Sequence, residues 1–368
     1  MPGLGGDNGN ENIRLSNGAQ STYISRTVVE FNYFSNTGMG DSEAISVKCQ
    51  ENVLRYNTFT QNPDAMMVFR NGNDNIAYGN FFIDAGGIRL KEANNIYLYN
   101  NYFERAGVSG TMNAVTYDYV TGNLKNINFL HNTFVEPGKI DLSSGATSNT
   151  WANNIFVKNV GDIFMGSAGG INWYSNLYSG ASLGISIPVS GMRAADPKLS
   201  INADGYFSLS SASPAINAAT FSISGIPDIA NVDDDPTIRY DASMQFRDSS
   251  KDIGSDEFVI GDRINRLLKL SDVGPSYLGG PNGASQPSQP PAVPVLSIGS
   301  PTKSSLTLSW VEDTAIVPVT GFDILRCSGL RCTPSLVIAS VGNSTRKYTD
   351  SGLPRWLCRE GGGNLKLA

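Results

Sequence analysis

Short β-forming stretches separated by bends make up the first half of the chain. Residues 53–56 (Val-Leu-Arg-Tyr) and 96–99 (Ile-Tyr-Leu-Tyr) are two such stretches, and Gly, Asn and Asp interrupt the sequence between them. Branched and aromatic residues favour strands, whereas Gly, Asn and Asp favour bends. The pattern therefore predicts an all-β fold built from many short strands.

One motif recurs between the bends: an apolar or aromatic stretch, an Asn, one further residue, and then an aromatic residue. Successive copies lie 21 to 31 residues apart, and most steps are close to 22 residues. The sixth copy contains two adjacent Asn residues, Asn153 and Asn154. Taking Asn153 in place of Asn154 as the recurring residue gives the better alignment. The recurring residues are Asn32, Asn57, Asn80, Asn101, Asn132, Asn154 (or Asn153) and Asn176.

A repeat of about 22 residues, without the leucine framework or helical spacing of other repeat proteins, predicts a solenoid with one structural unit per turn. With β-forming stretches in each turn, that solenoid is a parallel β-helix. Strands of stacked coils lie about 4.8 Å apart, so an Asn at the same bend of each coil can bond to the Asn above and below it. The aromatic residue two places later then points into the core. Such a ladder predicts a scaffold and, alone, no activity.

The size of the chain suggests two domains, since 368 residues exceed one ordinary core. The net charge of −6 and the lack of a basic patch argue against a nucleic-acid partner, and no apolar run is long enough to span a bilayer. Residues 1–10 lack the features of a signal peptide. Because residue 1 falls where a coil is already under way, we expect a fragment whose upstream coils and export signal are missing.

The motif fades after Tyr178, and the segment that follows predicts a cap, so the β-helix domain is placed at residues 1–260. Residues 274–294 are rich in Pro, Gly and Ser and predict an extended linker. Polar and apolar residues then alternate over residues 305–310, which predicts a small β-sandwich at residues 295–353.

This second domain resembles a fibronectin type III module. The early-strand Trp of such modules matches Trp310, and a third strand that starts Gly-aromatic-x-Ile matches residues 321–324. Residues 354–368 lack the alternation of the last strands, so we expect an incomplete module with an irregular tail. Cys327 and Cys332 either close a small disulfide loop or remain free thiols.

Charged side chains are sparse in the predicted solenoid, and four of them form a pattern. Asp41 and Glu43 are two residues apart and share a strand face, and Lys48 follows five residues later. Arg70 lies one coil beyond Lys48, so the two cations are expected to stack on one wall. Two stacked cations require a nearby anion. Periodicity leaves two interpretations equally open, a site for an acidic ligand and a solvated charged face.

Five ordered motifs from about Asn8 to Gly107 resemble the central segment of family 6 polysaccharide lyases, and residues 252–257 more loosely resemble their closing strand. That family includes alginate lyases and the dermatan-cleaving chondroitinase B, on a right-handed parallel β-helix. The motifs are residues 40–48 (Gly-Asp-Ser-Glu-Ala-Ile-Ser-Val-Lys), 55–59 (Arg-Tyr-Asn-Thr-Phe), 69–72 (Phe-Arg-Asn-Gly), 79–82 with 86–89 (Gly-Asn-Phe-Phe and Gly-Gly-Ile-Arg) and 100–103 (Asn-Asn-Tyr-Phe).

The resemblance implies a set of site residues. It implies a Ca²⁺ site at Asn8, Asp41 and Glu43, with Asp41 standing where the family usually has Glu. It also implies that Lys48 is the Brønsted base and Arg70 the proposed acid. Substrate-binding positions are implied at Arg89 and at Asn71, which stands where the family commonly has His.

The implied chemistry suits these residue types. Elimination across C4 and C5 of a uronic acid removes a weakly acidic proton beside a carboxylate, and a bound Ca²⁺ offsets the charge of that carboxylate. Lys48 must be neutral to accept the proton, which a nearby cation favours. A guanidinium is a poor proton donor, so Arg70 is interpreted as a charge clamp that relays a proton through water or a hydroxyl.

Aromatic residues and the single His are interpreted mainly as structural. His131 precedes a recurring Asn and is expected to be a bend residue, and Trp151 and Trp173 are expected to pack in the core. Tyr117 and Tyr119 lie in the irregular 31-residue coil, where they could line the cleft.

The sequence therefore predicts a secreted or periplasmic, Ca²⁺-dependent lyase for a uronate-containing polysaccharide. Alginate is the favoured substrate, and dermatan is the second. An inverting glycoside hydrolase would need clustered carboxylates on one wall and fits a Lys-Arg site poorly. A carbohydrate-binding β-helix without catalysis remains open, and the oligomeric state is not indicated.

Overall fold

The computed structural model describes most of the first 274 residues and parts of the remainder. The described residues are 11–17, 22–37, 42–118, 124–142, 147–223, 226–227, 229, 238–259, 263–274, 295–299, 302, 305–311, 321–326, 336–342, 344–351 and 365–367. The chain divides into two units, Met1–Val273 and Gly274–Ala368. Apart from Gly274, the linker expected at residues 274–294 lies outside the described residues.

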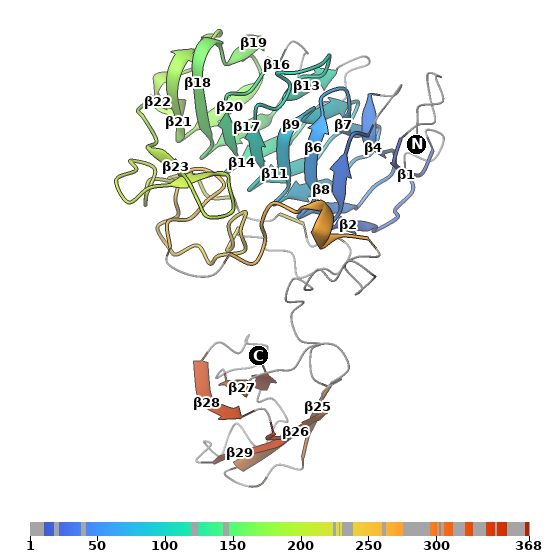
Figure 1. Ribbon diagram of the computed structural model, residues 1–368, viewed down its shortest axis with the longest axis vertical. Coiled ribbons are helices and arrows are strands. Elements are labelled where there is room, and N and C mark those ends of the chain that lie inside the picture. Colours follow the sequence, from blue (N-terminus) through green and yellow to red (C-terminus); the bar gives the residue numbers. More distant parts are fainter. Residues whose placement is uncertain are drawn as a thin grey trace. The chain divides into compact units, whose positions relative to one another are not determined.

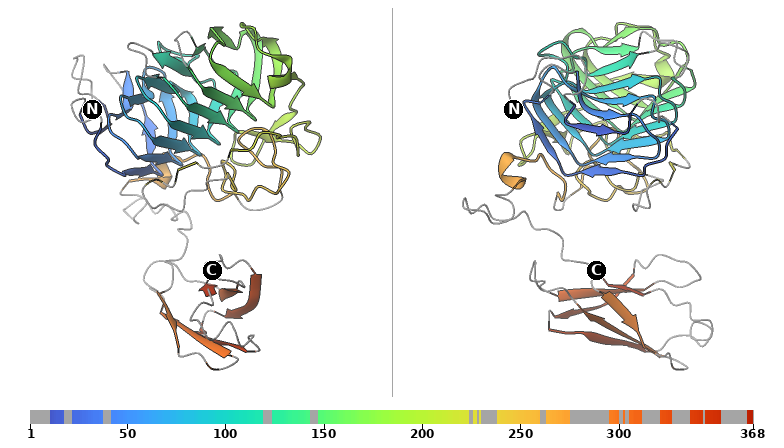
Figure 2. Two further views of the ribbon diagram at one scale, coloured as in Figure 1. Left: turned by 180° about the vertical axis from the view of Figure 1, so that it is seen from behind. Right: turned by 90° about the vertical axis from the view of Figure 1, so that its right-hand side faces the viewer.

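The described part of the first unit is a stack of coils, and each complete coil gives one strand to each of three parallel sheets (Figures 1 and 2). Sheet 1 contains β1 (Ile13–Leu15), β4 (Glu43–Val47), β7 (Met66–Arg70), β10 (Ile88–Lys91), β13 (Val115–Asp118), β16 (Ile140–Leu142) and β19 (Phe164–Gly166). Sheet 2 contains β2 (Val28–Glu30), β5 (Val53–Arg55), β8 (Asn75–Tyr78), β11 (Ile96–Tyr99), β14 (Ile127–Leu130), β17 (Asn149–Ala152) and β20 (Ile171–Tyr174). Sheet 3 contains β3 (Tyr33–Ser35), β6 (Thr58–Asn62), β9 (Phe81–Ala85), β12 (Tyr102–Glu104), β15 (Thr133–Val135), β18 (Ile155–Asp162), β21 (Asn176–Ser182) and β22 (Met192–Ala194). The all-β class and the parallel β-helix predicted from the repeat are confirmed.

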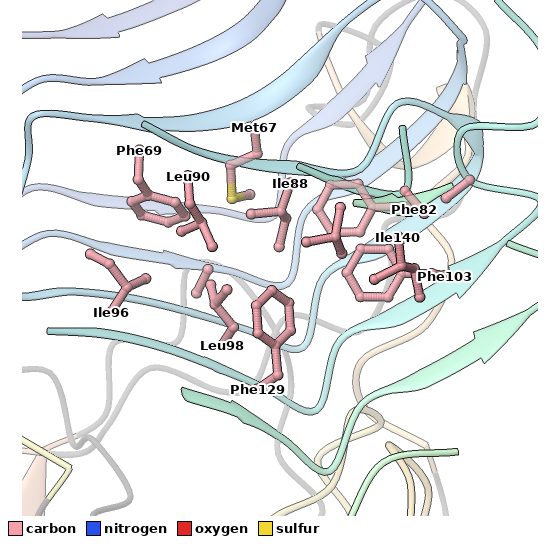
Figure 3. Close-up of a cluster of buried hydrophobic side chains, with 14 of the residues drawn as sticks. Met67, Phe69, Phe82, Ile88, Leu90, Ile96, Leu98, Phe103, Phe129 and Ile140 are labelled. Carbon is pink, nitrogen blue, oxygen red and sulfur yellow. The ribbon is translucent and has the colours of Figure 1, made fainter. Parts of the chain in front are cut away.

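Alternate residues of each strand fill the interior of the coils. Met67 and Phe69 of β7 are fully buried and lie level with Ile88 and Leu90 of β10 (Figure 3). The aromatic residue two places after the recurring Asn lies in the core, as predicted, from Phe34 to Phe156, and over this range each ring stacks on its counterpart in the next coil. The ring centroids of Phe82 and Phe103, for example, are 4.7 Å apart. One continuous apolar core therefore runs through the stack.

The recurring Asn residues form a hydrogen-bonded ladder. The amide of Asn101 donates to Oδ1 of Asn132 at 3.1 Å and to the carbonyl of Ala77 at 3.0 Å. Its own Oδ1 accepts from the backbone and side-chain nitrogens of Asn80 at 3.1 and 3.0 Å. The same arrangement joins Asn32, Asn57, Asn80, Asn101, Asn132, Asn154 and Asn176.

The shift from Asn154 to Asn153 was wrong, because Asn154 is the residue in the ladder. Asn153 occupies the bend before it, with φ of 55°. Its side chain bonds instead to Nε2 of His131 and to the carbonyl of Phe221. Two adjacent Asn residues thus have different roles, set by the left-handed backbone of the bend.

His131 lies at the same bend position one coil earlier, with φ of 51°, as a bend residue. Its Nδ1 lies 3.0 Å from the carbonyl oxygen of Asp252, and its Nε2 lies 2.9 Å from Nδ2 of Asn153. An amide nitrogen only donates, so Nε2 accepts and Nδ1 carries the proton of a neutral ring. Burial, together with the charges of Arg247 and Lys251, holds the pKa of His131 well below its usual value.

The residues after Tyr178 cover the stack with little regular structure. They include the 3-10 helices η2 (Val189–Gly191) and η3 (Leu270–Asp272) and the antiparallel pair β23 (Leu199–Ile201) and β24 (Phe207–Leu209). Ile226, Ile229 and Ile238 pack on apolar side chains at the outer face of sheet 2. Within the part of the chain that the structure describes, no helix has the length and apolar character needed to cross a membrane.

Residues 252–257, expected to form a closing strand, are irregular, which corrects that expectation. A fully buried Arg247 fixes them: it donates to Oε2 of Glu257 at 2.9 Å and to the carbonyl of Gly254 at 2.7 Å. It also donates to Oδ1 of Asn100, on a coil bend, at 2.9 Å. These bonds, together with those from Gly254 N to the carbonyl of Asn153 and from Ser255 N to Oγ1 of Thr133, attach this segment in place of a strand ladder.

The described part of the second unit contains two antiparallel sheets. One contains β25 (Val295–Ile298), β26 (Ser305–Val311) and β29 (Lys347–Ser351), and the other contains β28 (Leu336–Gly342), β27 (Gly321–Arg326) and β30 (Leu365–Leu367). Leu308 and Trp310 of β26 share a buried cluster with Phe322 and Ile324 of β27. Cys327, Cys332 and most of the tail at residues 354–368 lie outside the described residues, and the fibronectin type III resemblance stays a prediction.

Replacement of Asn101 by Ala should destabilise the β-helix by about 3 kcal/mol, because it removes the acceptor of the buried backbone N–H of Asn80 and the donors to Ala77 and Asn132. Urea unfolding followed by circular dichroism measures the loss. Asn172→Ala, at an exposed position of β20, is the control and should change stability by less than about 0.5 kcal/mol. Equal losses in the two variants would contradict a stabilising ladder.

Stability should fall as the pH rises toward neutral because of Asp256. Burial, helped by the negative charge of Asp241, raises the pKa of Asp256 to about 7. A carboxyl whose pKa is higher in the folded than in the unfolded chain stabilises the fold below its unfolded pKa, and that contribution disappears as pH rises through the folded value. Melting temperatures measured from pH 5 to 8 should therefore decline less in Asp256→Asn than in the parent. An unchanged decline would contradict this assignment.

The ring of His131 should stay neutral where an ordinary histidine becomes protonated. As the chain contains a single His, its imidazole signals can be assigned without ambiguity. Two-dimensional ¹H–¹⁵N spectra from pH 8 down to about pH 6 should show one protonated nitrogen, Nδ1, and no titration. A midpoint near the usual value would show that the hydrogen bonds to Asn153 and Asp252 do not persist in solution.

Candidate functional site

The candidate site lies on the outer face of sheet 1, at the ends of β4, β7, β10 and β13. Val47 pairs with Phe69, and both side chains are in the core, so the next residues, Lys48 and Arg70, face outward on neighbouring coils. Arg70 in turn pairs with Lys91, and Lys91 pairs with Asp118. The 22-residue spacing thus brings Lys48 and Arg70 to one wall, as expected from the repeat.

Arg70 is held by Glu43, the first residue of β4. Its Nη1 lies 3.1 Å from Oε1 of Glu43. Only 3% of the Glu43 side chain is exposed, whereas 34% of the Arg70 side chain is exposed. The carboxylate therefore lies under the guanidinium, which keeps part of its surface available to a ligand.

Lys48 has a carboxylate partner that the sequence interpretation missed. Its Nζ lies 3.1 Å from Oε1 of Glu11, which precedes β1, and both side chains are nearly buried. Burial alone would raise the pKa of Glu11, but hydrogen bonds from its backbone and from Lys48, with the charges of Lys48 and Arg14, outweigh burial and hold it below its usual value. Glu11 lies three residues after Asn8 in the sequence, and that proximity to an expected metal ligand was the available signal.

The residues of sheet 1 beneath these charged side chains are uncharged. Ser46 and Val68 alternate with core residues and so face outward, yet both are completely buried. Met66 of β7, which pairs with Glu43, is 1% exposed. The charged side chains thus lie on an apolar surface, which strengthens their electrostatic interactions relative to those in open water.

Arg89 lies one coil further on, and a different acid holds it. Its Nε donates to Oδ2 of Asp118 at 3.0 Å, and its Nη2 donates to the same oxygen. Lys91 Nζ lies 3.6 Å from that oxygen. Burial alone would raise the pKa of Asp118, but the hydrogen bond and charge of Arg89 and the charge of Lys91 outweigh it, so that the pKa is lowered. Neither Lys91 nor Asp118 was among the expected site residues.

The other expected residues have separate outcomes. Asn71 follows Arg70 in a left-handed bend, with φ of 61°, a conformation that Asn tolerates well. Tyr117 does not line a cleft: it is buried, and its hydroxyl accepts a hydrogen bond from Trp151 Nε1 at 3.0 Å. Trp151 and Trp173 pack in the core as predicted. Tyr119 lies outside the described residues.

The expected calcium ligands are described only in part, because Asn8 and Asp41 lie outside the described residues. Glu43 is a buried carboxylate on the same wall as Lys48, and carboxylate oxygen suits a hard cation. No group of three His, Cys, Asp or Glu side chains with metal-binding geometry occurs among the described residues. The one described ligand thus has the right chemistry, and a complete site would need the other two.

Comparisons with known proteins match part of the chain. The family model of chondroitinase B matches residues 1–123, which include every residue of the candidate site. No curated protein matches the chain.

Several solved structures are similar in part. The PL6 family alginate lyase AlyGC is 26% identical with a TM-score of 0.49, over 56% of this chain and 31% of that one. The alginate lyase AlyF-OU02, solved with G6, is 18% identical with a TM-score of 0.39, over 55% of this chain and 51% of that one. The chain thus spans about a third to a half of the length of these enzymes. Its residues 1–123 match the chondroitinase B family, and the chain resembles family 6 polysaccharide lyases, as its motifs predicted.

Proposed function

We propose that the β-helix cleaves a uronate-containing acidic polysaccharide by β-elimination at the outer face of sheet 1. One observation carries the proposal: Lys48 and Arg70 lie side by side on consecutive coils, each fixed by a carboxylate, within the span that matches the chondroitinase B family. A base and a fixed cation at adjacent positions are what proton removal beside a carboxylate requires.

In the proposed reaction, the ammonium of Lys48 first releases a proton to water, and the resulting amine takes the proton from C5 of the uronate. The electron pair of that C–H bond forms the C4–C5 double bond, and the C4–O bond breaks. Arg70 offsets the negative charge that develops on the sugar carboxylate, and the leaving oxygen takes a proton from water or from a hydroxyl beside Arg70. Glu11 keeps the Lys48 amine at the wall, and Glu43 does the same for Arg70.

We also propose that the site takes Ca²⁺ through Asn8, Asp41 and Glu43. When bound, the ion would neutralise the uronate carboxylate and so make the C5 proton more acidic. Asp41 is one methylene shorter than the Glu that is usual in the family, so we expect weaker binding than a Glu would give.

Alginate is the first proposed substrate, and dermatan sulfate is the second. The motif resemblance supports a uronate polymer in both cases, and the match to chondroitinase B keeps dermatan in consideration. Either polymer lies outside the cell, so the proposal places the protein in a secreted or periplasmic location.

The test is to incubate the protein with alginate and, separately, with dermatan sulfate, and to follow the ultraviolet absorbance of the new double bond. The parent should act on one of them in the presence of Ca²⁺ and lose activity after chelation. Lys48→Ala should lower kcat by about a thousandfold or more, because it removes the proposed base. Lys125→Ala, at an exposed position just before β14 of sheet 2, is the matched control and should keep full activity.

A folded parent with no activity on either polymer would overturn the proposal. If the inactive parent and Lys48→Ala then bound the polysaccharide equally well, the result would favour a carbohydrate-binding β-helix without catalysis. Products without the double bond would indicate a hydrolase instead.

A further inference from the structure

Beyond Arg70, two more cations continue the row on the outer face of sheet 1. Lys91 pairs with Arg70 in the strand register, and Arg89 lies two residues before Lys91 on the same face of β10. Stacked strands are about 4.8 Å apart, so this pair lies about one strand spacing from Arg70. The position is therefore next to the proposed reacting sugar, along the direction in which the coils stack.

One carboxylate oxygen serves both cations. Oδ2 of Asp118 accepts two hydrogen bonds from Arg89 and lies 3.6 Å from Nζ of Lys91. Two positive charges against one negative charge leave a net positive charge at this point of the wall. A second anion can therefore be attracted here without any change in the fold.

The exposure of Asp118 distinguishes it from the other two acids of the wall. The side chains of Glu11 and Glu43 are each 3% exposed, whereas that of Asp118 is 24% exposed. Buried carboxylates cannot leave their partners without a large desolvation cost, and this cost is smaller for a carboxylate that already contacts water. Of these three acids, Asp118 is thus the one that a ligand can displace at the lowest cost.

We propose that Arg89 and Lys91 form a second carboxylate-binding subsite, and that Asp118 is its resident counter-ion, which the carboxylate of a neighbouring uronate displaces. The proposal rests on the proposed function for the identity of the sugar, but it concerns binding and not turnover. Asp118 then determines specificity: it offsets one of the two cations when no ligand is bound, and it weakens the binding of any polyanion that does not fit both cations.

The test measures binding in the Lys48→Ala background, where turnover cannot interfere. Isothermal titration with oligoguluronate, and separately with dermatan sulfate oligosaccharides, compares Lys48→Ala with Lys48→Ala/Asp118→Asn at low salt. Loss of the competing carboxylate should tighten binding by about three- to tenfold and steepen its salt dependence. Adding Arg89→Gln should remove the gain.

Asp84→Asn in the same background is the matched control. Asp84 also forms an ion pair with an arginine, Arg105, and also loses one negative charge, but it lies at the end of β9 in sheet 3. Its affinity should stay within about twofold of the background, because Asp84 forms its ion pair with Arg105 and not with a cation of the proposed subsite. Melting temperatures show that each variant is folded.

Unchanged or weaker binding in the Asp118→Asn variant would overturn the inference, because Asp118 would then be neutral or would hold Arg89 in its binding position. An equal gain in Asp84→Asn would also overturn it, since net charge alone would explain the effect. Absence of binding by every variant would remove the subsite altogether. Tighter binding by Asp118→Asn in a protein whose parent shows no turnover would uphold the subsite and reject the lyase, so the two proposals fail separately.

Discussion

The asparagine ladder is the interaction on which the rest of the structure depends. Each buried side-chain amide takes up the backbone N–H of the preceding coil and donates to the next Asn, so that polar bends in the middle of the stack remain fully hydrogen-bonded. Because a slipped coil would leave these groups unpaired, the ladder sets one register for all three sheets. The stacking of Phe82 on Phe103 and the alignment of Lys48 with Arg70 both follow from that register.

This register also places like charges close together in the candidate site. Cations at equivalent positions of successive coils are brought within a strand spacing of one another, where they repel. Acidic residues from three different places form ion pairs with these cations. They are Glu11 from before β1, Glu43 from the start of β4, and Asp118 from the coil beyond Arg89. The result is a wall on which Lys48 and Arg70 each have their own acid, Arg89 and Lys91 share one, and the acids differ in how deeply they are buried.

The periodic part of this structure could be predicted from the sequence, and the aperiodic part could not. The repeat gave the parallel β-helix, the ladder and the common wall of Lys48 and Arg70, because each depends only on residues one coil apart. The repeat did not identify which of the adjacent residues Asn153 and Asn154 joins the ladder. Both are Asn, and they differ only in the backbone conformation of the bend. Glu11 lies 37 residues before Lys48, which is no multiple of the coil length, and Arg247 holds residues 252–257 without any repeat. Tyr117 points into the core, where its hydroxyl accepts a hydrogen bond from the buried Trp151.

The irregular 31-residue coil shows what this construction permits. Its additional length lies at the bends, whereas Tyr102 still pairs with Thr133 and Ile96 with Ile127. Loop length and strand alignment are therefore independent variables in this fold. Insertions at the corners can remodel what surrounds the outer face of sheet 1 while the distances between its charges remain constant.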